Sequence, residues 1–357
     1  MKKVLALALS LVMTLCVLSP ALAEETPYIA IISKGFQHQF WQTVLAGSED
    51  AAKEYNVRVT FDGPPSESDI SIQVDMLNAA LANNPAALAL AALDTESVTE
   101  QLTTALEKGI PVIGFDSGAP NAPEGSIIST ASTDNEAAGA LAAETMFAIP
   151  EIADAINAAT AEAPITIGVI SQDATSASIT GRSIGFLTKM SELVEAVKPG
   201  QVEITGHDKY AKPAAEAVAV ELCILVPATT DIVDATTTAQ GMLAKENLVG
   251  LFLTNELSVR GILGATADGQ DFNKENGKFK DLVVIGFDSG ATLLNAVRNG
   301  WFYGAVTQDP YMIGYLAVEL AVKALAGEEI PEIVDTGCQF YNSENMDDEK
   351  IAPLLYD

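Results

Sequence analysis

A five-residue segment, Gly-Phe-Asp-Ser-Gly, occurs twice in this chain, at 114–118 and again at 286–290. Each copy follows an apolar run, at 110–113 in the first and 282–285 in the second. Such runs, followed by glycine and an acid, are typical of buried parallel strands that present a carboxylate at their carboxyl ends. Ligands bind at that edge of open α/β sheets. The repeat therefore predicts one fold used twice, with Asp116 and Asp288 facing each other across a cleft.

Short apolar segments alternate with amphipathic helical segments from Tyr28 onward. We expect strands at 29–32, 57–61, 86–91, 111–115, 165–170, 202–205, 217–225, 249–253, 282–287 and 303–306. We expect helices at 40–55, 69–82, 96–108, 136–147, 181–197, 231–244, 257–266, 291–299 and 311–326. This alternation predicts parallel sheets with helices on both faces. Residues 206–227 interrupt it, and there we expect an inserted hairpin or an extra edge strand.

The first 23 residues have the pattern of a cleaved signal peptide. Lys2 and Lys3 precede an apolar run at 4–18, and small residues lead up to Ala23. The run is too short to span a bilayer, so we expect an exported protein in the periplasm or at the outer face of the cell membrane. Cys16 allows an alternative, a lipid anchor, but Leu15 stands before it where a lipidation site needs a small residue.

The charge of the chain argues against nucleic-acid binding. Its formal net charge is −29, with 48 acidic against 19 basic residues, and such a field repels phosphate backbones. Beyond the signal segment only Cys223 and Cys338 remain, and we expect two free thiols in preference to a disulfide.

Motifs of enzymes and metal sites are absent from the sequence. It contains no Gly-x-Ser-x-Gly elbow, no phosphate-binding loop and no His-Glu-x-x-His helix. The two histidines, His38 and His207, have no neighbouring metal-ligand residues, and the acidic segment 268–277 does not have the spacing of a calcium loop. We therefore expect neither catalysis, nor a metal, nor a cofactor.

Aromatic residues crowd the turn after the first predicted strand. Phe36, Phe40 and Trp41 fall within six positions, with His38 between them. Aromatic rings stack against the C–H faces of sugars, while polar neighbours bond the hydroxyls. The alternative is that Phe40 and Trp41 open a helix and point into the core, and we expect at least one of the two rings to face the cleft.

With these segments in view, the chain resembles the type I periplasmic binding proteins, specifically the ribose-binding group of sugar-binding proteins that feed ABC importers. The resemblance is carried by 28–47, both copies of Gly-Phe-Asp-Ser-Gly, 132–135, 181–186, 252–256 and 305–310. It extends over nearly the whole mature chain, and its strength lies in the order and spacing of these segments.

The resemblance implies a set of ligand-binding residues. The family's stacking aromatics fall on Phe40 and Trp41, its first-lobe carboxylate on Asp116, and its second-lobe amide, second-lobe carboxylate and hinge amide on Asn255, Asp288 and Gln308. His38, Ser117 and Arg182 complete the expected set. Planar carboxylate and amide groups can engage adjacent hydroxyls.

Each of several positions also has a structural alternative. Asp288 and Asn255 could cap the helices that follow them, and Gln308 could serve only the crossover backbone. Arg182 could pack against its own helix. His38 stands where relatives carry asparagine, and Ser117 where some carry arginine, so the resemblance does not imply ribose itself.

The resemblance also implies the architecture: two similar doubly wound α/β lobes joined by a three-strand hinge, with the ligand in the cleft between them. We expect crossovers near 133–134, 308–309 and 335–336, which gives a first lobe of 26–133 plus 309–335 and a second of 134–308 plus 336–357. Hinge closure would capture a monosaccharide or polyol and present it to an ABC permease.

Other functions remain open at this stage. We expect a monomer. A receptor that hands a sugar or signal to a chemotaxis or sensor-kinase partner would share every residue above. An exported enzyme would need the two aspartates placed about a substrate bond. A transcriptional repressor is disfavoured because a signal segment stands where DNA-binding helices would.

Overall fold

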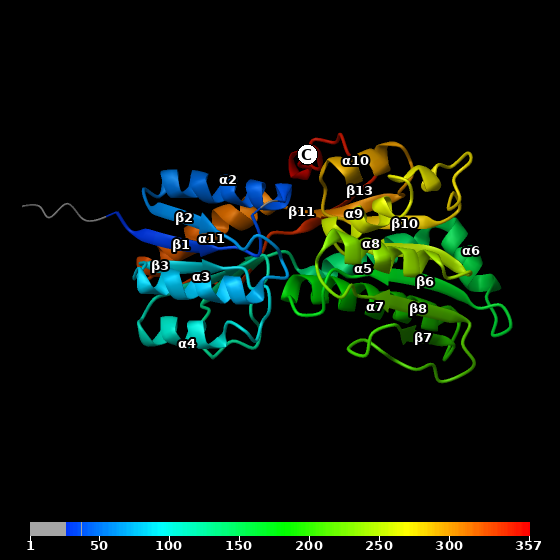
Figure 1. Cartoon of the computed structure of the whole chain (residues 1–357), viewed down its shortest axis with the longest axis horizontal. Coiled ribbons are helices and arrows are strands. Elements are labelled where there is room, and N and C mark those ends of the chain that lie inside the picture. The colour runs from blue at the N-terminus through cyan, green and yellow to red at the C-terminus, as the bar shows by residue number, and fades with distance from the viewer. Residues whose placement is uncertain (1–25, 37) are drawn as a thin grey trace, which may run out of the picture.

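The computed structural model describes residues 26–36 and 38–357. The predicted signal peptide and Cys16 lie outside these residues. The described elements form two bodies, each with a central sheet covered by helices on both faces (Figure 1). The expected α/β class with two doubly wound parallel-sheet lobes is therefore confirmed.

The first sheet has the strand order β12-β5-β4-β3-β1-β2, and all its pairings are parallel. Its strands are β1 (Tyr28–Ile32), β2 (Arg58–Asp62), β3 (Ala87–Leu90), β4 (Val112–Phe115), β5 (Ser129–Ser132) and β12 (Ile333–Asp335). The helices around it are α2 (Gln39–Glu54), α3 (Ile70–Ala82), α4 (Thr99–Glu107) and α11 (Pro310–Leu325).

The second sheet has the order β13-β11-β10-β9-β6-β8-β7, with only β13 antiparallel. Its strands are β6 (Ile165–Ile170), β7 (Val202–Thr205), β8 (Val220–Leu225), β9 (Leu248–Leu253), β10 (Val283–Phe287), β11 (Gly304–Gln308) and β13 (Cys338–Tyr341). Its helices are α5 (Asn135–Ala148), α6 (Pro150–Ala158), α7 (Ala177–Val197), α8 (Ile232–Leu243), α9 (Glu256–Gly264) and α10 (Ala291–Arg298), with short 3₁₀ turns η1 (Gln270–Phe272) and η2 (Ala352–Leu354).

The expectation of an inserted hairpin or extra edge strand at 206–227 is wrong. β8 pairs in parallel with both β6 and β7, so it is an interior strand and the edge is β7. The connection between β7 and β8 crosses without a helix and is held by a backbone bridge between Ile204 and Lys212. A hairpin would require antiparallel neighbours.

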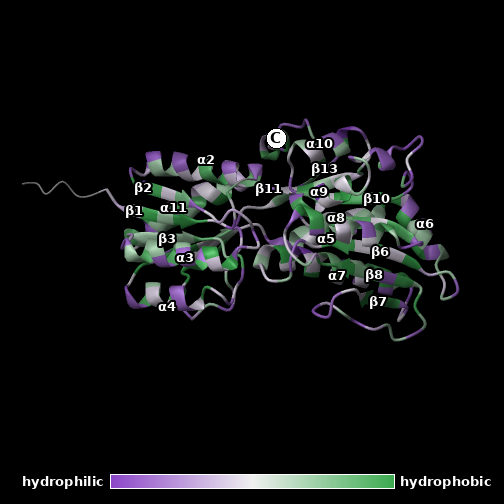
Figure 2. Cartoon of the chain, viewed as in Figure 1, coloured by the Kyte–Doolittle hydropathy of each residue, from purple (hydrophilic) through white to green (hydrophobic). Residues whose placement is uncertain are grey.

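The core consists of a layer of buried apolar side chains on each face of each sheet. Figure 2 shows the strands as mostly hydrophobic and the outer faces of the helices as mostly hydrophilic, which is the pattern of a sheet covered on both sides. Cys223 lies on β8 and Cys338 on β13, toward opposite edges of the second sheet, and both are free thiols. Among the described residues, no helix has both the length and the apolar character to cross a bilayer.

One closely packed helix pair stabilises each lobe. α2 packs on α11, and a Cβ on Gly47 would lie 2.0 Å from the carbonyl oxygen of Tyr311. α5 packs on α7 in the other lobe, where a Cβ on Gly185 would lie 2.0 Å from the carbonyl oxygen of Glu136. Both contacts bring backbone against backbone, which only glycine allows.

The chain passes between the sheets three times, after β5, after β11 and after β12. Thr133 links the three passages, because its hydroxyl donates to Gln308 Oε1 at 3.1 Å and to the carbonyl oxygen of Gly337 at 3.2 Å. The carboxyl edges of both sheets meet beside these passages.

Candidate functional site

The two copies of the repeated segment have the same unusual backbone. Asp116 follows β4 with φ 53°, and Asp288 follows β10 with φ 76°. Left-handed conformations are uncommon for residues other than glycine, although short polar side chains tolerate them best. Both aspartates are almost fully buried, with 3% and 6% of their surface exposed. The equivalent turns aim both carboxylates into the space between the sheets.

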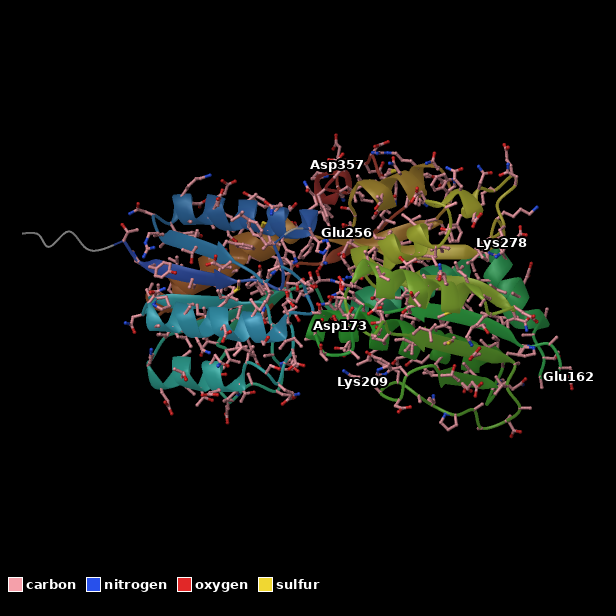
Figure 3. All side chains as sticks on the ribbon, in the orientation of Figure 1. Glu162, Asp173, Lys209, Glu256, Lys278 and Asp357 are labelled. Carbon is pink, nitrogen blue, oxygen red and sulfur yellow. The ribbon has the colours of Figure 1, made fainter. Side chains whose placement is uncertain are left out.

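That space is a cavity of about 40 Å³, lined by side chains from both lobes. Its lining residues are Lys34, His38, Phe40, Trp41, Glu67, Asp116, Gln172, Ile179, Arg182, Asn255, Glu256, Leu257, Asp288 and Gln308. A single water needs roughly 10–15 Å³ on the same measure, so the cavity has room for more than one. Figure 3 shows Glu256 and Asp173 between the two bodies, where many polar side chains converge.

All but one of the nine predicted binding residues line this cavity. The exception is Ser117, whose hydroxyl lies 3.4 Å from the backbone nitrogen of Ser178 and so joins the two lobes beside the cavity.

Asp116 is paired with a lysine that the sequence reasoning missed. Lys34 Nζ lies 2.9 Å from Asp116 Oδ2 and donates to Ser178 Oγ of the other lobe at 2.9 Å. Burial disfavours the ammonium, yet the charges of Asp116 and Glu67 outweigh it and raise the pKa of Lys34. Within the described residues Asp116 Oδ2 is buried and has no hydrogen bond of normal geometry.

Asp288 is held by two other side chains. Gln308 Nε2 donates to its Oδ1 at 2.7 Å, and Arg182 Nη1 lies 3.7 Å from its Oδ2. Burial raises the pKa of Asp288, while Arg182 and the Gln308 hydrogen bond act in the opposite direction. The capping alternative for Asp288 is wrong, because the N-cap of α10 is Gly290 and no side chain caps that helix.

Arg182 both packs within the second lobe and lines the cavity. Its Nε donates to Asn135 Oδ1 at 2.9 Å and its Nη1 to the carbonyl oxygen of Thr254 at 3.0 Å. The guanidinium carbon lies 3.8 Å from the centre of the Phe287 ring, which is a cation–π contact.

Two predicted amides also combine a structural contact with a place in the cavity lining. Asn255 caps α9, since its Oδ1 accepts from the backbone nitrogen of Ser258 at 3.2 Å. Its Nδ2 donates to Gln172 Oε1. Gln308 contacts Asp288 through its nitrogen and Thr133 through its oxygen. Helix capping therefore accounts for the oxygen of the Asn255 amide, and the crossover contact accounts for the oxygen of the Gln308 amide. The nitrogen of each amide contacts another residue of the cavity lining.

The aromatic pair at the start of α2 lines the cavity with both rings. Phe40 and Trp41 are edge to face, with ring centroids 4.9 Å apart, and Trp41 also contacts Phe115 in the core. Trp41 Nε1 donates to Glu67 Oε1 at 2.9 Å, which fixes the orientation of the indole.

Polar contacts cross the cleft at its rim. His38 Nδ1 lies 3.7 Å from Glu256 Oε1, and Glu67 Oε2 accepts from Gln172 Nε2 at 2.9 Å. The nearby Glu256 carboxylate raises the pKa of His38. Burial of Glu67 favours its neutral form, but Lys34 and His38 lower the pKa of its carboxyl overall.

Four polar lining residues were absent from the sequence prediction: Lys34, Glu67, Gln172 and Glu256. Lys34 and Gln172 each stand two residues after a strand, β1 and β6, so the rule that identified Asp116 and Asp288 would have found them. Glu67 lies in the loop between β2 and α3, where no strand end marks it.

The site is suited to binding molecules with many hydroxyl groups. It combines two aromatic rings with buried carboxylate oxygens: Asp116 Oδ2 lies beside the Lys34 ammonium, and Glu256 Oε2 has no hydrogen-bond partner within the described residues. Hydroxyl groups supply donors to such oxygens, and C–H faces pack against the rings. No cluster of three potential metal ligands occurs within residues 26–36 and 38–357.

A family model described as "Periplasmic binding protein domain" matches residues 29–329. The D-allose-binding periplasmic protein of Escherichia coli is 24% identical over 308 residues, which is 85% of this chain and 86% of that protein.

Solved structures are similar over nearly the whole length. One from Brachyspira murdochii, described as an ABC transporter and LacI family transcriptional regulator, is 40% identical with a TM-score of 0.78, over 93% of this chain and 99% of that one. An ABC transporter solute-binding protein from Agrobacterium vitis with bound D-fucose is 27% identical with a TM-score of 0.74, over 92% and 100%.

Proposed function

The chain belongs to the family of periplasmic binding protein domains, and we propose that it captures one small sugar or polyol outside the cytoplasm and delivers it to the permease of an ABC importer. The observation that carries the proposal is the cavity between the lobes. It is lined by buried carboxylates, of which Glu256 Oε2 has no hydrogen-bond partner within the described residues, and by two aromatic rings. The allose-binding and fucose-bound relatives support the same class of ligand.

The proposed binding residues are the predicted lining residues together with the four additional polar ones. Asp116 and Asp288 accept hydroxyl hydrogen bonds, Phe40 and Trp41 pack against the sugar ring, and Lys34 neutralises Asp116. The further contacts come from His38, Glu67, Gln172, Arg182, Asn255, Glu256 and Gln308. A missing hydroxyl would leave a buried group unpaired at a cost of about 1–3 kcal/mol, which gives such a site its selectivity.

Capture proceeds by closure of two lobes about the three crossovers. We assign residues 26–133 plus 309–335 to the first lobe and 134–308 plus 336–357 to the second. Contacts such as Glu67 to Gln172 and Lys34 to Ser178 join the lobes only when they are closed, so a permease can distinguish the loaded protein by its shape. We assign the first 23 residues to a cleaved signal peptide and expect a monomer.

Intrinsic fluorescence tests the proposal. Trp41 lines the cavity and Trp301 does not, so a bound sugar should change the emission of Trp41 alone. In a titration with D-allose, D-ribose, D-fucose, D-arabinose and xylitol, we expect a saturable change with at least one compound. The change should persist in Trp301→Phe and vanish in Trp41→Phe. A response that survives in Trp41→Phe would contradict binding at this site.

A further inference from the structure

The last residues of the chain return to the second copy of the repeated segment. After η2 the backbone runs over Ser289, and Tyr356 N donates to Ser289 Oγ at 2.9 Å. Gly290 N donates to the Tyr356 carbonyl oxygen at 2.8 Å, and Ser289 N lies 3.4 Å from the Tyr356 phenol oxygen. Tyr356 is therefore fixed to the second lobe directly beside Asp288.

The ring of Tyr356 nevertheless packs against side chains of the first lobe. Its centroid is 6.3 Å from that of Phe40 in an edge-on arrangement, and only 8% of the residue is exposed. It belongs to the apolar cluster that contains Phe40, Trp41 and Val44 on one face of the first sheet. Figure 1 shows the C-terminal end of the chain between α2 and α10, that is, between elements of the two lobes.

These contacts connect the lobes through a residue that does not line the cavity. Opening the cleft moves the first lobe away from the second, and the hydrogen bonds to Ser289 and Gly290 keep Tyr356 with the second. The ring would then leave the apolar cluster and become exposed, which disfavours opening. Closure also brings Tyr356 behind Phe40, one of the two rings that line the cavity.

We propose that Tyr356 is an interlobe latch, a side chain held by the second lobe and buried by the first, which stabilises the closed conformation without contacting the ligand. The latch adds to the proposed function a residue that sets the balance between open and closed forms. It acts whether or not a ligand is present.

Disulfide trapping of the closed form tests the latch without any ligand. Ser66 Oγ and Thr230 Oγ1 lie 3.5 Å apart across the cleft, so a Ser66→Cys, Thr230→Cys pair can join only when the lobes are closed. The rate of disulfide formation under mild oxidation then measures the fraction of closed protein. The two variants with a single introduced cysteine correct for disulfides formed with the native Cys223 and Cys338. We expect Tyr356→Ala to lower this rate about tenfold, because the ring contact and its burial are both lost.

Two controls separate a latch from a general loss of structure. Deletion of the exposed Asp357 should leave the trapping rate unchanged, and Tyr356→Phe, which keeps the ring, should lower it less than Tyr356→Ala. In a Phe40→Ala background, Tyr356→Ala should have little further effect, because the contact is already broken. An unchanged trapping rate in folded Tyr356→Ala would overturn the proposal. It would also be overturned if Tyr356→Ala lowered the trapping rate equally with Phe40 present and in the Phe40→Ala background.

Discussion

At the scale of single residues, Asp116 and Asp288 share a backbone conformation but have different partners. The ammonium of Lys34 lies beside Asp116, whereas the amide of Gln308 and the more distant guanidinium of Arg182 lie near Asp288. A repeated sequence has thus produced two chemically distinct acceptors.

Removing the charge of Asp116 should weaken sugar binding. Asparagine tolerates the left-handed backbone at this position, so Asp116→Asn should fold while losing a charged acceptor and the pairing with Lys34. A loss of about 1–3 kcal/mol corresponds to an affinity roughly 5-fold to 150-fold lower in calorimetric titration. Asp75→Asn, on the exposed face of α3, is the matched control and should bind as the unaltered protein does. Equal affinities for both variants would exclude Asp116 from the binding set.

The His38–Glu256 pair should make the protein more stable at low pH. Glu256 raises the pKa of His38 above its ordinary value of 6.5, while Glu67 acts in the same direction and Arg260 opposes it. Because the pKa of His38 is higher in the folded than in the unfolded protein, the pair stabilises the folded state fully at a pH below the unfolded-state pKa. This stabilisation is lost as the pH rises through the folded-state pKa. As the pH rises from about 6 to about 8, the temperature of half-unfolding should therefore decrease more steeply in the unaltered protein than in His38→Gln. Parallel pH profiles for the two proteins would show that the pair contributes nothing.

Sequence reasoning found the site residues whose position follows from strand ends. Asp116 and Asp288 were identifiable because an apolar run leads directly to each, and the aromatic turn after β1 was equally visible. Glu67 could not be found in this way, because its place depends on how the loop after β2 folds back over Trp41. Asn255 and Gln308 each make two contacts, and their partners stand on other segments of the chain that only the fold brings together.

At the scale of elements, each lobe contains helices that pack closely at glycine. In α11, a Cβ on Gly314 would lie 1.9 Å from the carbonyl oxygen of Val44 in α2, a distance that requires the helices to separate. Gly314→Ala should therefore destabilise the protein by about 1–3 kcal/mol in urea unfolding. Gly241→Ala in α8 is the control, since its nearest neighbour is 4.0 Å away and alanine favours a helix. Comparable losses for both variants would contradict the close-packing argument.

The strands missed from sequence are short ones at or next to the edges of the sheets. β5, β12 and β13 have four, three and four residues, and none of them carries a long apolar run. α6 was missed because Ile149 is the single residue that separates it from α5, and it begins directly at Pro150. The stretch at 206–227 was misread because a parallel crossover without a helix lacks the helical period that signals a βαβ unit.

At the scale of the whole molecule, the structure has closed lobes around a polar cavity, held by contacts that run along the cleft. They include ion pairs and hydrogen bonds at its rim and the apolar contact of Tyr356 at its far end. The formal charge of −29 gives no reason to expect an anionic ligand, and the lysine in the cavity is neutralised by its own carboxylates. The site is thus suited to a neutral polyhydroxylated molecule.

Native mass spectrometry of the purified protein, after incubation with an equimolar mixture of ribose, fucose, allose and xylitol, shows directly whether the cleft holds such a molecule. We expect a single 1:1 complex, in which one compound dominates and is recovered chemically unchanged. The absence of any complex at saturating concentrations would contradict the proposed ligand class, and a recovered compound of altered mass would show catalysis instead of capture.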